Sequence, residues 1–176
     1  IWFDTMYQGA RGNLDPKTGE ITYYPLPPEY NDDTVQLNFT GLRYDVDGKV
    51  WTKSVGTQHI FRLDLATKTW ERFKPTDTLT TVNRAAIYQV ISDSQNNLWM
   101  AEFTQGHLGK IDAKTLAVKW FPLPTPYGRA RRMNIDKQDQ IVVTEYRGNQ
   151  VALFDTKTEK YTEYMMPPYT FPYLSL

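Results

Sequence analysis

A repeat that occurs four times constrains the fold of this chain more than any other feature of its sequence. Each copy has an anchor position, an aspartate 13 residues later, and a threonine three residues after the aspartate. The anchors are Trp2, Trp51, Trp99 and Val142, the aspartates are Asp15, Asp64, Asp112 and Asp155, and the threonines are Thr18, Thr67, Thr115 and Thr158. Successive anchors are 49, 48 and 43 residues apart. Four copies with one internal offset predict a repeat architecture built from one supersecondary unit.

Residues 97–124 show what one copy is expected to form. An apolar run at Leu98–Met100, a second run that ends at Ile111 and a third run that leads into 121–124 are separated by polar turn residues. Short alternating runs of this kind are typical of an antiparallel meander. An Asp side chain accepts a backbone N–H two residues further on, and Thr does so more weakly. The Asp and Thr of residues 112–115 are therefore predicted to close the second hairpin.

A fourth strand is predicted ahead of the later anchors, at residues 39–46, 86–91 and 132–135. Four strands in a period of 40-odd residues indicate an all-β fold, a β-propeller with about four four-stranded blades over residues 1–176. Proline-rich exits after the third run suit edge strands. Residues 171–176 resemble a strand that precedes an anchor, so they could close a four-bladed ring. We favour the alternative, a portion of a ring of six to eight blades, because propellers usually have more than four.

Composition excludes several classes of function. Lys plus Arg and Asp plus Glu both number 20, so the net charge is zero and favours neither nucleic acid nor an anionic membrane as a partner. The chain has no cysteine and two histidines, which excludes disulfides, thiolate metal sites and histidine-rich metal sites. No run of about 20 apolar residues predicts a membrane span. The absence of cysteine and the Ile at position 1 suggest an exported protein, periplasmic or extracellular.

The motifs W-x-x-E, G-x-x-x-(I/L)-D-x-x-T and (F/Y)-P-L-P together resemble the virginiamycin B lyase (streptogramin lyase) family. The resemblance implies a propeller of seven blades and an enzyme that opens a cyclic depsipeptide by elimination at an ester, with a general-base histidine and bound magnesium. The family's histidines precede an anchor by about ten residues. In this chain the matching positions hold Arg131 and Arg132, Tyr88 and Gln89, and Thr40 and Gly41. An arginine stays protonated near neutral pH and cannot serve as the base.

The candidate ligand-binding residues are Arg129, Arg131, Arg132, Tyr88 and Gln89. The three arginines form the densest basic cluster of the chain and could bind a carboxylate or phosphate. The alternative is that they pair with Glu145, Asp136 or a neighbouring blade.

Glu102 and Glu145 are the candidate metal ligands, because each lies three residues after an anchor, where the family has an acidic residue. Two carboxylates near a central axis could hold magnesium, and the alternative is that each pairs with a nearby Arg or Lys. His59 and His107 both lie eight residues after an anchor and are expected on the surface.

Two functional interpretations follow. The first is a non-catalytic propeller that presents its top-face loops to a protein partner or to a small anionic or peptide ligand, and requires no cofactor. The second is a magnesium-dependent carbon–oxygen lyase that opens a cyclic depsipeptide ester. In both cases the remaining propeller blades, or a companion chain, are the expected structural partners.

Overall fold

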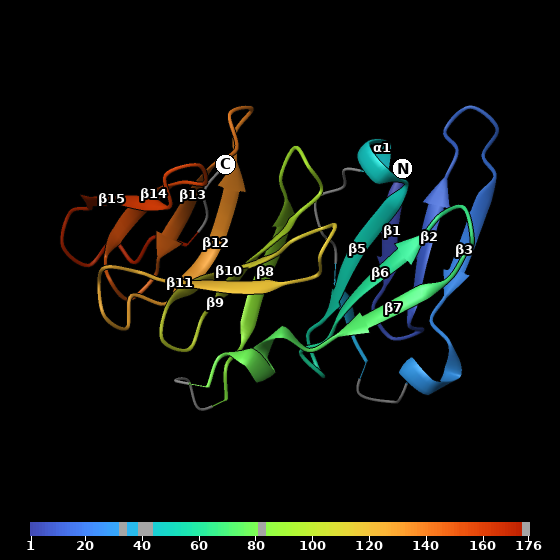
Figure 1. Cartoon of the computed structure of the whole chain (residues 1–176), viewed down its shortest axis with the longest axis horizontal. Helices are drawn as coiled ribbons and strands as arrows, with labels where there is room; N and C mark the ends of the chain where they lie inside the picture. Colours follow the sequence, from blue (N-terminus) through green and yellow to red (C-terminus); the bar gives the residue numbers. More distant parts are fainter. Residues whose placement is uncertain (32–34, 39–43, 81–83, 174–176) are drawn as a thin grey trace. The chain divides into compact units, whose positions relative to one another are not determined.

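A computed structural model describes residues 1–31, 35–38, 44–80 and 84–173. Within these ranges the chain forms four antiparallel sheets that follow one another in sequence (Figure 1). Contacts divide the chain into two compact units, Ile1–Lys74 and Pro75–Leu176, and each contains two sheets. The predicted all-β fold is confirmed. No helix in the described part of the chain is long and apolar enough to cross a membrane.

The first unit contains a three-stranded sheet and a four-stranded sheet, each with its strands in chain order. The strands are β1 (Trp2–Thr5), β2 (Ala10–Leu14), β3 (Ile21–Pro25), β4 (Leu37–Asn38), β5 (Lys49–Ser54), β6 (Ile60–Asp64) and β7 (Trp70–Phe73). A 3-10 turn covers Pro28–Tyr30. The first sheet has three strands, and a fourth strand is predicted only ahead of the later anchors.

The strand predicted over residues 39–46 is wrong where it can be compared with the structure. Leu37–Asn38 form β4, residues 39–43 lie outside the described ranges, and Tyr44–Asp47 form a single helical turn, α1. The physical reason is the pairing of β4 with β5, in which Leu37 lies opposite Ser54 and Asn38 opposite Lys53, because this pairing leaves Tyr44–Asp47 in the connection between the two strands.

The second unit contains two four-stranded sheets, also in chain order. The strands are β8 (Ile87–Ser92), β9 (Leu98–Glu102), β10 (His107–Ile111), β11 (Val118–Pro122), β12 (Ala130–Ile135), β13 (Gln140–Glu145), β14 (Gln150–Asp155) and β15 (Lys160–Met165). A second 3-10 turn covers Pro75–Thr78. As expected for proline, Pro25 and Pro122 end β3 and β11, which are edge strands of their sheets.

The repeat read from the sequence reappears in the strand register. The anchors lie in β1, β5, β9 and β13, and each pairs with the residue 11 positions later. In two sheets that partner is a cation above the anchor ring: the Arg62 guanidinium lies 5.0 Å from the Trp51 centroid, and the Lys110 ammonium lies 5.6 Å from that of Trp99. Cation–π contact thus adds to the cross-strand pairing of the repeat.

The predicted aspartate turns are confirmed in all four copies. Each aspartate carboxylate accepts the backbone N–H two residues later, at 2.8 to 3.0 Å. The residue after each repeat threonine has positive φ, and these residues are Gly19, Lys68, Leu116 and Glu159. The side-chain hydrogen bond therefore holds a left-handed turn even where the chain has no glycine.

Aromatic rings from both sheets form the core of the second unit. Trp99 of β9 and Phe121 of β11 have ring centroids 5.7 Å apart, and Phe154 of β14 lies 5.6 Å from Trp99 and 5.0 Å from Phe121. The hydroxyl of Tyr161 donates to the carbonyl of Phe121 at 3.0 Å. Burial of each such side chain contributes about 2 to 3 kcal/mol, so facing sheets are what stabilise each meander.

The strand expected at residues 171–176 does not form over its described part, 171–173, and 174–176 lie outside the described ranges. The side chain of Asn149 holds this end of the chain in a turn. Its carbonyl accepts the N–H of Thr170 at 2.9 Å and of Phe171 at 3.2 Å, and its amide donates to the carbonyl of Pro167 at 2.9 Å. These bonds occupy backbone groups that a ladder would need.

Candidate functional site

One edge of the second unit brings together three connections. They are the β9–β10 turn (103–106), the β13–β14 turn (146–149) and the crossover from β11 to β12 (123–129). The N–H of Arg147 donates to the carbonyl of Gly128 at 2.9 Å, which ties one turn to the crossover. The predicted site residues all lie at this edge or at the adjoining strand ends.

Arg131 is the centre of a group of side chains that we call the arginine–aromatic cluster. Its guanidinium carbon lies 3.7 Å from the ring centroid of Tyr173, 4.5 Å from Tyr146, 5.0 Å from Tyr88 and 5.8 Å from Phe103. Its Nη2 donates to the Tyr88 hydroxyl at 3.1 Å. The faces of aromatic rings attract a cation, so four rings fix the position of this guanidinium.

The other two arginines join the same cluster. The Arg129 guanidinium lies 5.2 Å from the Phe103 ring, and that of Arg132 lies 5.2 Å from the Tyr88 ring. The Nε atoms of Arg131 and Arg132 are buried and have no hydrogen-bond partner among the described residues. Within the same ranges no carboxylate forms an ion pair with any of the three.

Of the alternative expectations, pairing with Glu145 or Asp136 is not seen among the described residues, whereas pairing with a neighbouring sheet is, because Arg131 and Arg132 contact Tyr88 of β8. The side chain of Asp136 accepts the N–H groups of Gln138 and Gln140, each at 2.8 Å, and so closes its own turn. Glu145 is buried within its sheet. Among the described residues, the guanidinium groups of the cluster therefore contact aromatic rings and no carboxylate.

Tyr88 and Gln89 have different roles although they are adjacent in β8. The hydroxyl of Tyr88 lies 3.3 Å from that of Tyr173. This hydrogen bond has the largest effect on the pKa of Tyr88 and lowers it. Burial opposes this effect, and the hydrogen bond from Arg131 adds to it. The side-chain carbonyl of Gln89 instead accepts the N–H of Met133 at 2.8 Å, so it links β8 to β12.

Glu102 is fully buried and closes the β9–β10 turn. Its carboxylate accepts the N–H groups of Thr104, Gln105 and Gly106 at 2.5, 3.2 and 3.2 Å, and Nδ1 of His107 lies 3.1 Å from it. Burial alone would raise the pKa of this acid, but the bonds from His107 and the turn outweigh burial and hold the pKa at about 2. Glu102 is therefore a carboxylate at neutral pH.

The same repeat position has the same task in the first unit. Thr5 and Ser54 lie three residues after their anchors, and their hydroxyls accept the N–H of Ala10 at 3.0 Å and of Thr57 at 3.2 Å. Glu102 is not paired with Arg or Lys among the described residues, contrary to its alternative interpretation, because the turn supplies backbone donors instead.

Glu145 occupies this position in the last copy but lacks those donors. The N–H groups of Arg147 and Gly148 donate to the carbonyl of Gly128, at 2.9 and 3.2 Å, and not to the acid. One carboxyl oxygen of Glu145, Oε1, has no partner among the described residues, and the other lies 3.4 Å from the side-chain nitrogen of Gln150. Two equivalent glutamates thus have unlike surroundings.

The surroundings of Glu145 favour its neutral form. Burial, followed by the nearby charge of Glu163, raises the pKa of Glu145 to about 8. Glu163 is itself held by Thr125 of the crossover, whose N–H and hydroxyl donate to it at 3.0 and 3.3 Å. The fold therefore favours the protonated form of Glu145, beside a carboxyl that is tied to the crossover.

These two environments do not fit the magnesium ion that Glu102 and Glu145 are expected to hold. Magnesium requires ionised or carbonyl oxygens with free lone pairs in an octahedral arrangement. The oxygens of Glu102 are used by its turn, and Glu145 favours a proton. In the part of the chain that the structure describes, no group of three His, Cys, Asp or Glu side chains could hold a metal ion.

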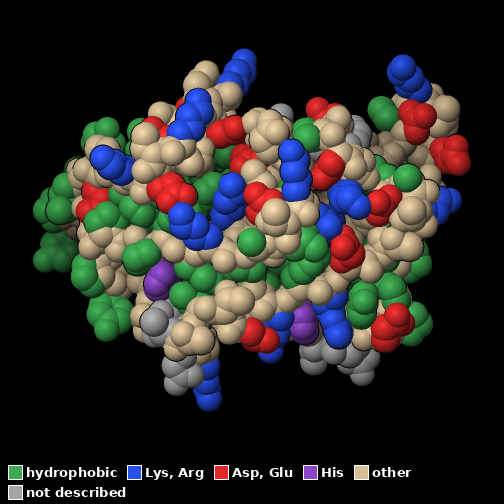
Figure 2. Space-filling model, viewed as in Figure 1, with side chains coloured by type: hydrophobic (Ala, Val, Ile, Leu, Met, Phe, Trp, Pro, Cys, Tyr) green, Lys and Arg blue, Asp and Glu red, His purple; other side chains and the backbone are tan. Residues whose placement is uncertain are grey.

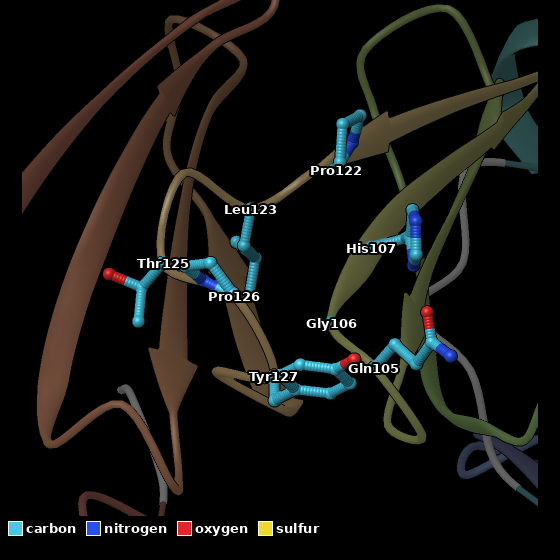
Figure 3. A pocket seen from close by; sticks show the side chains of 8 residues that line it. All are labelled: Gln105, Gly106, His107, Pro122, Leu123, Thr125, Pro126 and Tyr127. Carbon is cyan, nitrogen blue, oxygen red and sulfur yellow. The ribbon is translucent and has the colours of Figure 1, made fainter.

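His107 borders an open pocket of about 310 Å³ at the same edge (Figure 3). Figure 3 shows Gln105 and His107 on one side of the pocket and Leu123, Pro126 and Tyr127 on the other. The expectation of a surface histidine is wrong here, because the contact with Glu102 leaves only 12% of the His107 side chain exposed.

Sequence reasoning missed Phe103, Tyr146 and Tyr173 as members of the cluster. A signal for two of them is present in the repeat, since Phe103 and Tyr146 each follow the glutamate three residues after an anchor. No such signal exists for Tyr173, which lies 85 residues from Tyr88 in the chain.

Successive antiparallel sheets with one repeated register define the chain as a β-propeller protein. No protein-family model matches the chain, and no curated protein matches it either.

Several solved structures have a fold similar to that of this chain. The structure is similar to virginiamycin B lyase from Staphylococcus aureus (TM-score 0.72, 20% identity) and to a streptogramin B lyase (TM-score 0.74, 24% identity). Both matches cover 98% of this chain, but only 54% and 53% of those proteins, so the chain spans about half their length. The extracellular domain of a hybrid two-component system from B. thetaiotaomicron is also similar (TM-score 0.60, 19% identity), over 92% of this chain and 21% of that one.

Proposed function

We propose that this propeller is a non-catalytic binding module whose arginine–aromatic cluster recognises a carboxylate, in a small anion or in an acidic peptide. One observation carries the proposal: three arginines lie together at one edge, and no acid among the described residues neutralises them. A carboxylate is the natural partner of a guanidinium, because two parallel N–H donors match its two oxygens.

The surroundings of Arg131 favour binding over a purely structural role. Its four ring contacts hold the guanidinium in place without a counter-ion. The side chain is therefore already ordered before a ligand binds, so binding costs less conformational entropy. Elsewhere the charges are mixed, since Figure 2 shows basic and acidic side chains interspersed on the face in view. This mixture supports a small or local ligand and not a nucleic acid.

The test measures binding of N-acetylglutamate by chemical-shift changes in the protein's NMR spectrum, with neutral N-acetylglutamine as the matched ligand. Arg131→Met should weaken N-acetylglutamate binding at least tenfold, which corresponds to loss of one charge-assisted hydrogen-bond pair, about 1.4 kcal/mol or more. Arg147→Met, an exposed arginine outside the cluster, is the control and should leave binding unchanged. Equal binding of both ligands, or no effect of Arg131→Met, would contradict the proposal.

The module as proposed uses no magnesium. The surroundings of Glu102 and Glu145 support this. The chain also lacks histidine about ten residues before its anchors, where the lyase family has it, and Arg131 and Arg132 occupy two of these positions. Addition of magnesium should then change neither the melting temperature nor the NMR spectrum. Magnesium-dependent opening of a cyclic depsipeptide by the chain would refute the non-catalytic proposal.

We also propose that further blades, in the same polypeptide or in a companion chain, complete the propeller, and that the protein is exported. The first proposal is supported by the coverage of about half of each lyase, and the second by similarity to an extracellular domain. The intact mass of the gene product, together with any chain that co-purifies, tests the first. Cell fractionation tests the second, and recovery of the protein in the cytoplasm alone would contradict it.

A further inference from the structure

The pocket in Figure 3 has a lining that differs in kind from the arginine–aromatic cluster. Pro122, Leu123, Pro126 and the ring of Tyr127 give it apolar walls, and Gln105 and His107 supply its polar groups. None of these residues carries a permanent charge. A charged ligand would therefore lose its hydration without gaining a counter-ion, whereas an uncharged one would not.

The contact between His107 and Glu102 fixes which ring nitrogen carries the proton. Glu102 is ionised and can only accept hydrogen bonds, so the 3.1 Å contact requires that Nδ1 of His107 donates. In the neutral imidazole Nε2 then has a lone pair and acts as an acceptor. The structure gives Nε2 no partner among the described residues. His107, which lines the pocket, thus offers one hydrogen-bond acceptor in its neutral form, and the contact with Glu102 holds its ring.

The glutamate that orients His107 is itself immobile. Three consecutive N–H groups of the β9–β10 turn hold the Glu102 carboxylate, and the side chain is fully buried. A buried carboxylate that orients an imidazole is a recurrent arrangement wherever one ring nitrogen must face a ligand. The equivalent residue in the second sheet is Ser54, so His59 has no such carboxylate three residues after its anchor.

The wall opposite His107 also depends on a particular backbone. Gly106 has φ of 103°, and a Cβ atom at this position would lie 3.0 Å from both the side chain of Leu123 and the N–H nitrogen of Arg129. Glycine therefore lets the turn approach the crossover closely. Tyr127 is 65% exposed and offers a ring face at the rim, where it can stack on a flat ligand.

We propose that this pocket binds an uncharged ring that carries a hydroxyl donor, with the ring against Tyr127 and the prolines and the hydroxyl donating to Nε2 of His107. Phenols and pyranose sugars share this chemistry. The pocket volume of about 310 Å³ is at the lower end for ligand sites and suits a single ring. The site is separate from the carboxylate site proposed above and shares no residue with it.

The experiment uses the whole chain and NMR titration with three probes: p-cresol, methyl β-D-glucopyranoside, and 4-methylanisole, which has the ring of p-cresol but no donor. Binding of p-cresol or of the glucoside identifies the source of the ring, and shifts should map to Gln105, His107 and Tyr127. Loss of a neutral hydrogen bond predicts that 4-methylanisole binds about three- to tenfold more weakly than p-cresol. Equal binding of these two, or failure of both hydroxyl probes to bind, would overturn the proposal.

Two variants with matched controls complete the test. Tyr127→Ala removes an exposed ring and should weaken binding severalfold, whereas Tyr164→Ala removes another exposed tyrosine, on β15, and should not. His107→Phe should abolish the preference for p-cresol over 4-methylanisole, and His59→Phe should leave it intact. The long-range ¹H–¹⁵N spectrum of His107 should show the Nδ1–H form, and the Nε2–H form would overturn the proposal even if a variant failed to fold.

Discussion

Glu145 and Glu102 occupy the same repeat position, yet the structure predicts that their replacement by glutamine has opposite consequences for stability. Burial and Glu163 raise the pKa of Glu145 to about 8, above its ordinary value of 4.5. Because the folded-state pKa is the higher one, the fold favours the protonated acid. Its contribution to stability is complete below pH 4.5 and is lost as the pH rises through about 8.

The size of this effect follows from the two pKa values. A difference of 8 − 4.5, about 3.5 units, corresponds to a limit of about 5 kcal/mol at 1.36 kcal/mol per unit. Most of the loss, about 4 kcal/mol, falls between pH 5 and pH 9. Glutamine is neutral at every pH and has nearly the shape of the protonated acid. The free energy of unfolding of Glu145→Gln should therefore lack this decline and exceed that of the wild type at pH 9.

Glu102→Gln is the matched control with the reverse sign. The folded-state pKa of about 2 lies below 4.5, so the ionised acid contributes stability above pH 4.5, and the contribution is lost as the pH falls through about 2. The difference of about 2.5 units predicts that Glu102→Gln costs about 3 kcal/mol at pH 7. Urea unfolding followed by tryptophan fluorescence at pH 5, 7 and 9 measures both variants. Parallel pH profiles for the wild type and Glu145→Gln would refute the reasoning.

Three further changes test the fold. Asp112→Ala removes three hydrogen bonds from a turn that is exposed to solvent. It should lower the free energy of unfolding, measured in urea, by about 1 kcal/mol. An unchanged value would show that the turn does not need the Asp112 side chain. Gly109→Ala places a Cβ against the ring of Trp120 and 2.8 Å from Cε of Met100. It should lower the free energy of unfolding by about 1 to 3 kcal/mol. A melting temperature equal to that of the wild type would contradict this packing. Phe154→Ala should lower the free energy of unfolding, measured by calorimetry, by about 3 to 5 kcal/mol, because the ring fills the space between Trp99 and Tyr161. Phe154→Leu should lower it much less.

The repeat could be predicted because its signals are local. The carboxylate of Asp112 accepts N–H groups two and three residues away, and the anchor Trp99 pairs with Lys110 through one short turn. Such interactions depend on residue type and spacing alone, so the sequence sufficed for the meander, its turns and the all-β class. The turn at Tyr44–Asp47 shows the limit, since alternation predicted a strand there, whereas the pairing of β4 with β5 leaves these residues in the connection between the strands.

The sequence also pointed to Arg129, Arg131 and Arg132 as a cluster, but not to their partners. The rings around Arg131 come from positions 88, 103, 146 and 173. The repeat relates Phe103 to Tyr146, but it does not relate either of them to Tyr173. Contacts between segments so far apart depend on how the sheets pack. The pocket beside His107 depends on packing in the same way, because it needs the crossover at Leu123 close to Gly106.

The sequence by itself determined the repeated sheets and the aspartate turns that join their strands. Only the tertiary structure decided what each equivalent position does. Glu102 and Glu145 are the same residue at the same place in the repeat, and one is ionised while the other favours a proton. The physical reason is that a carboxyl group responds to the donors, charges and solvent that other segments supply, and the crossover at Gly128 accepts the N–H groups that Glu145 would otherwise receive.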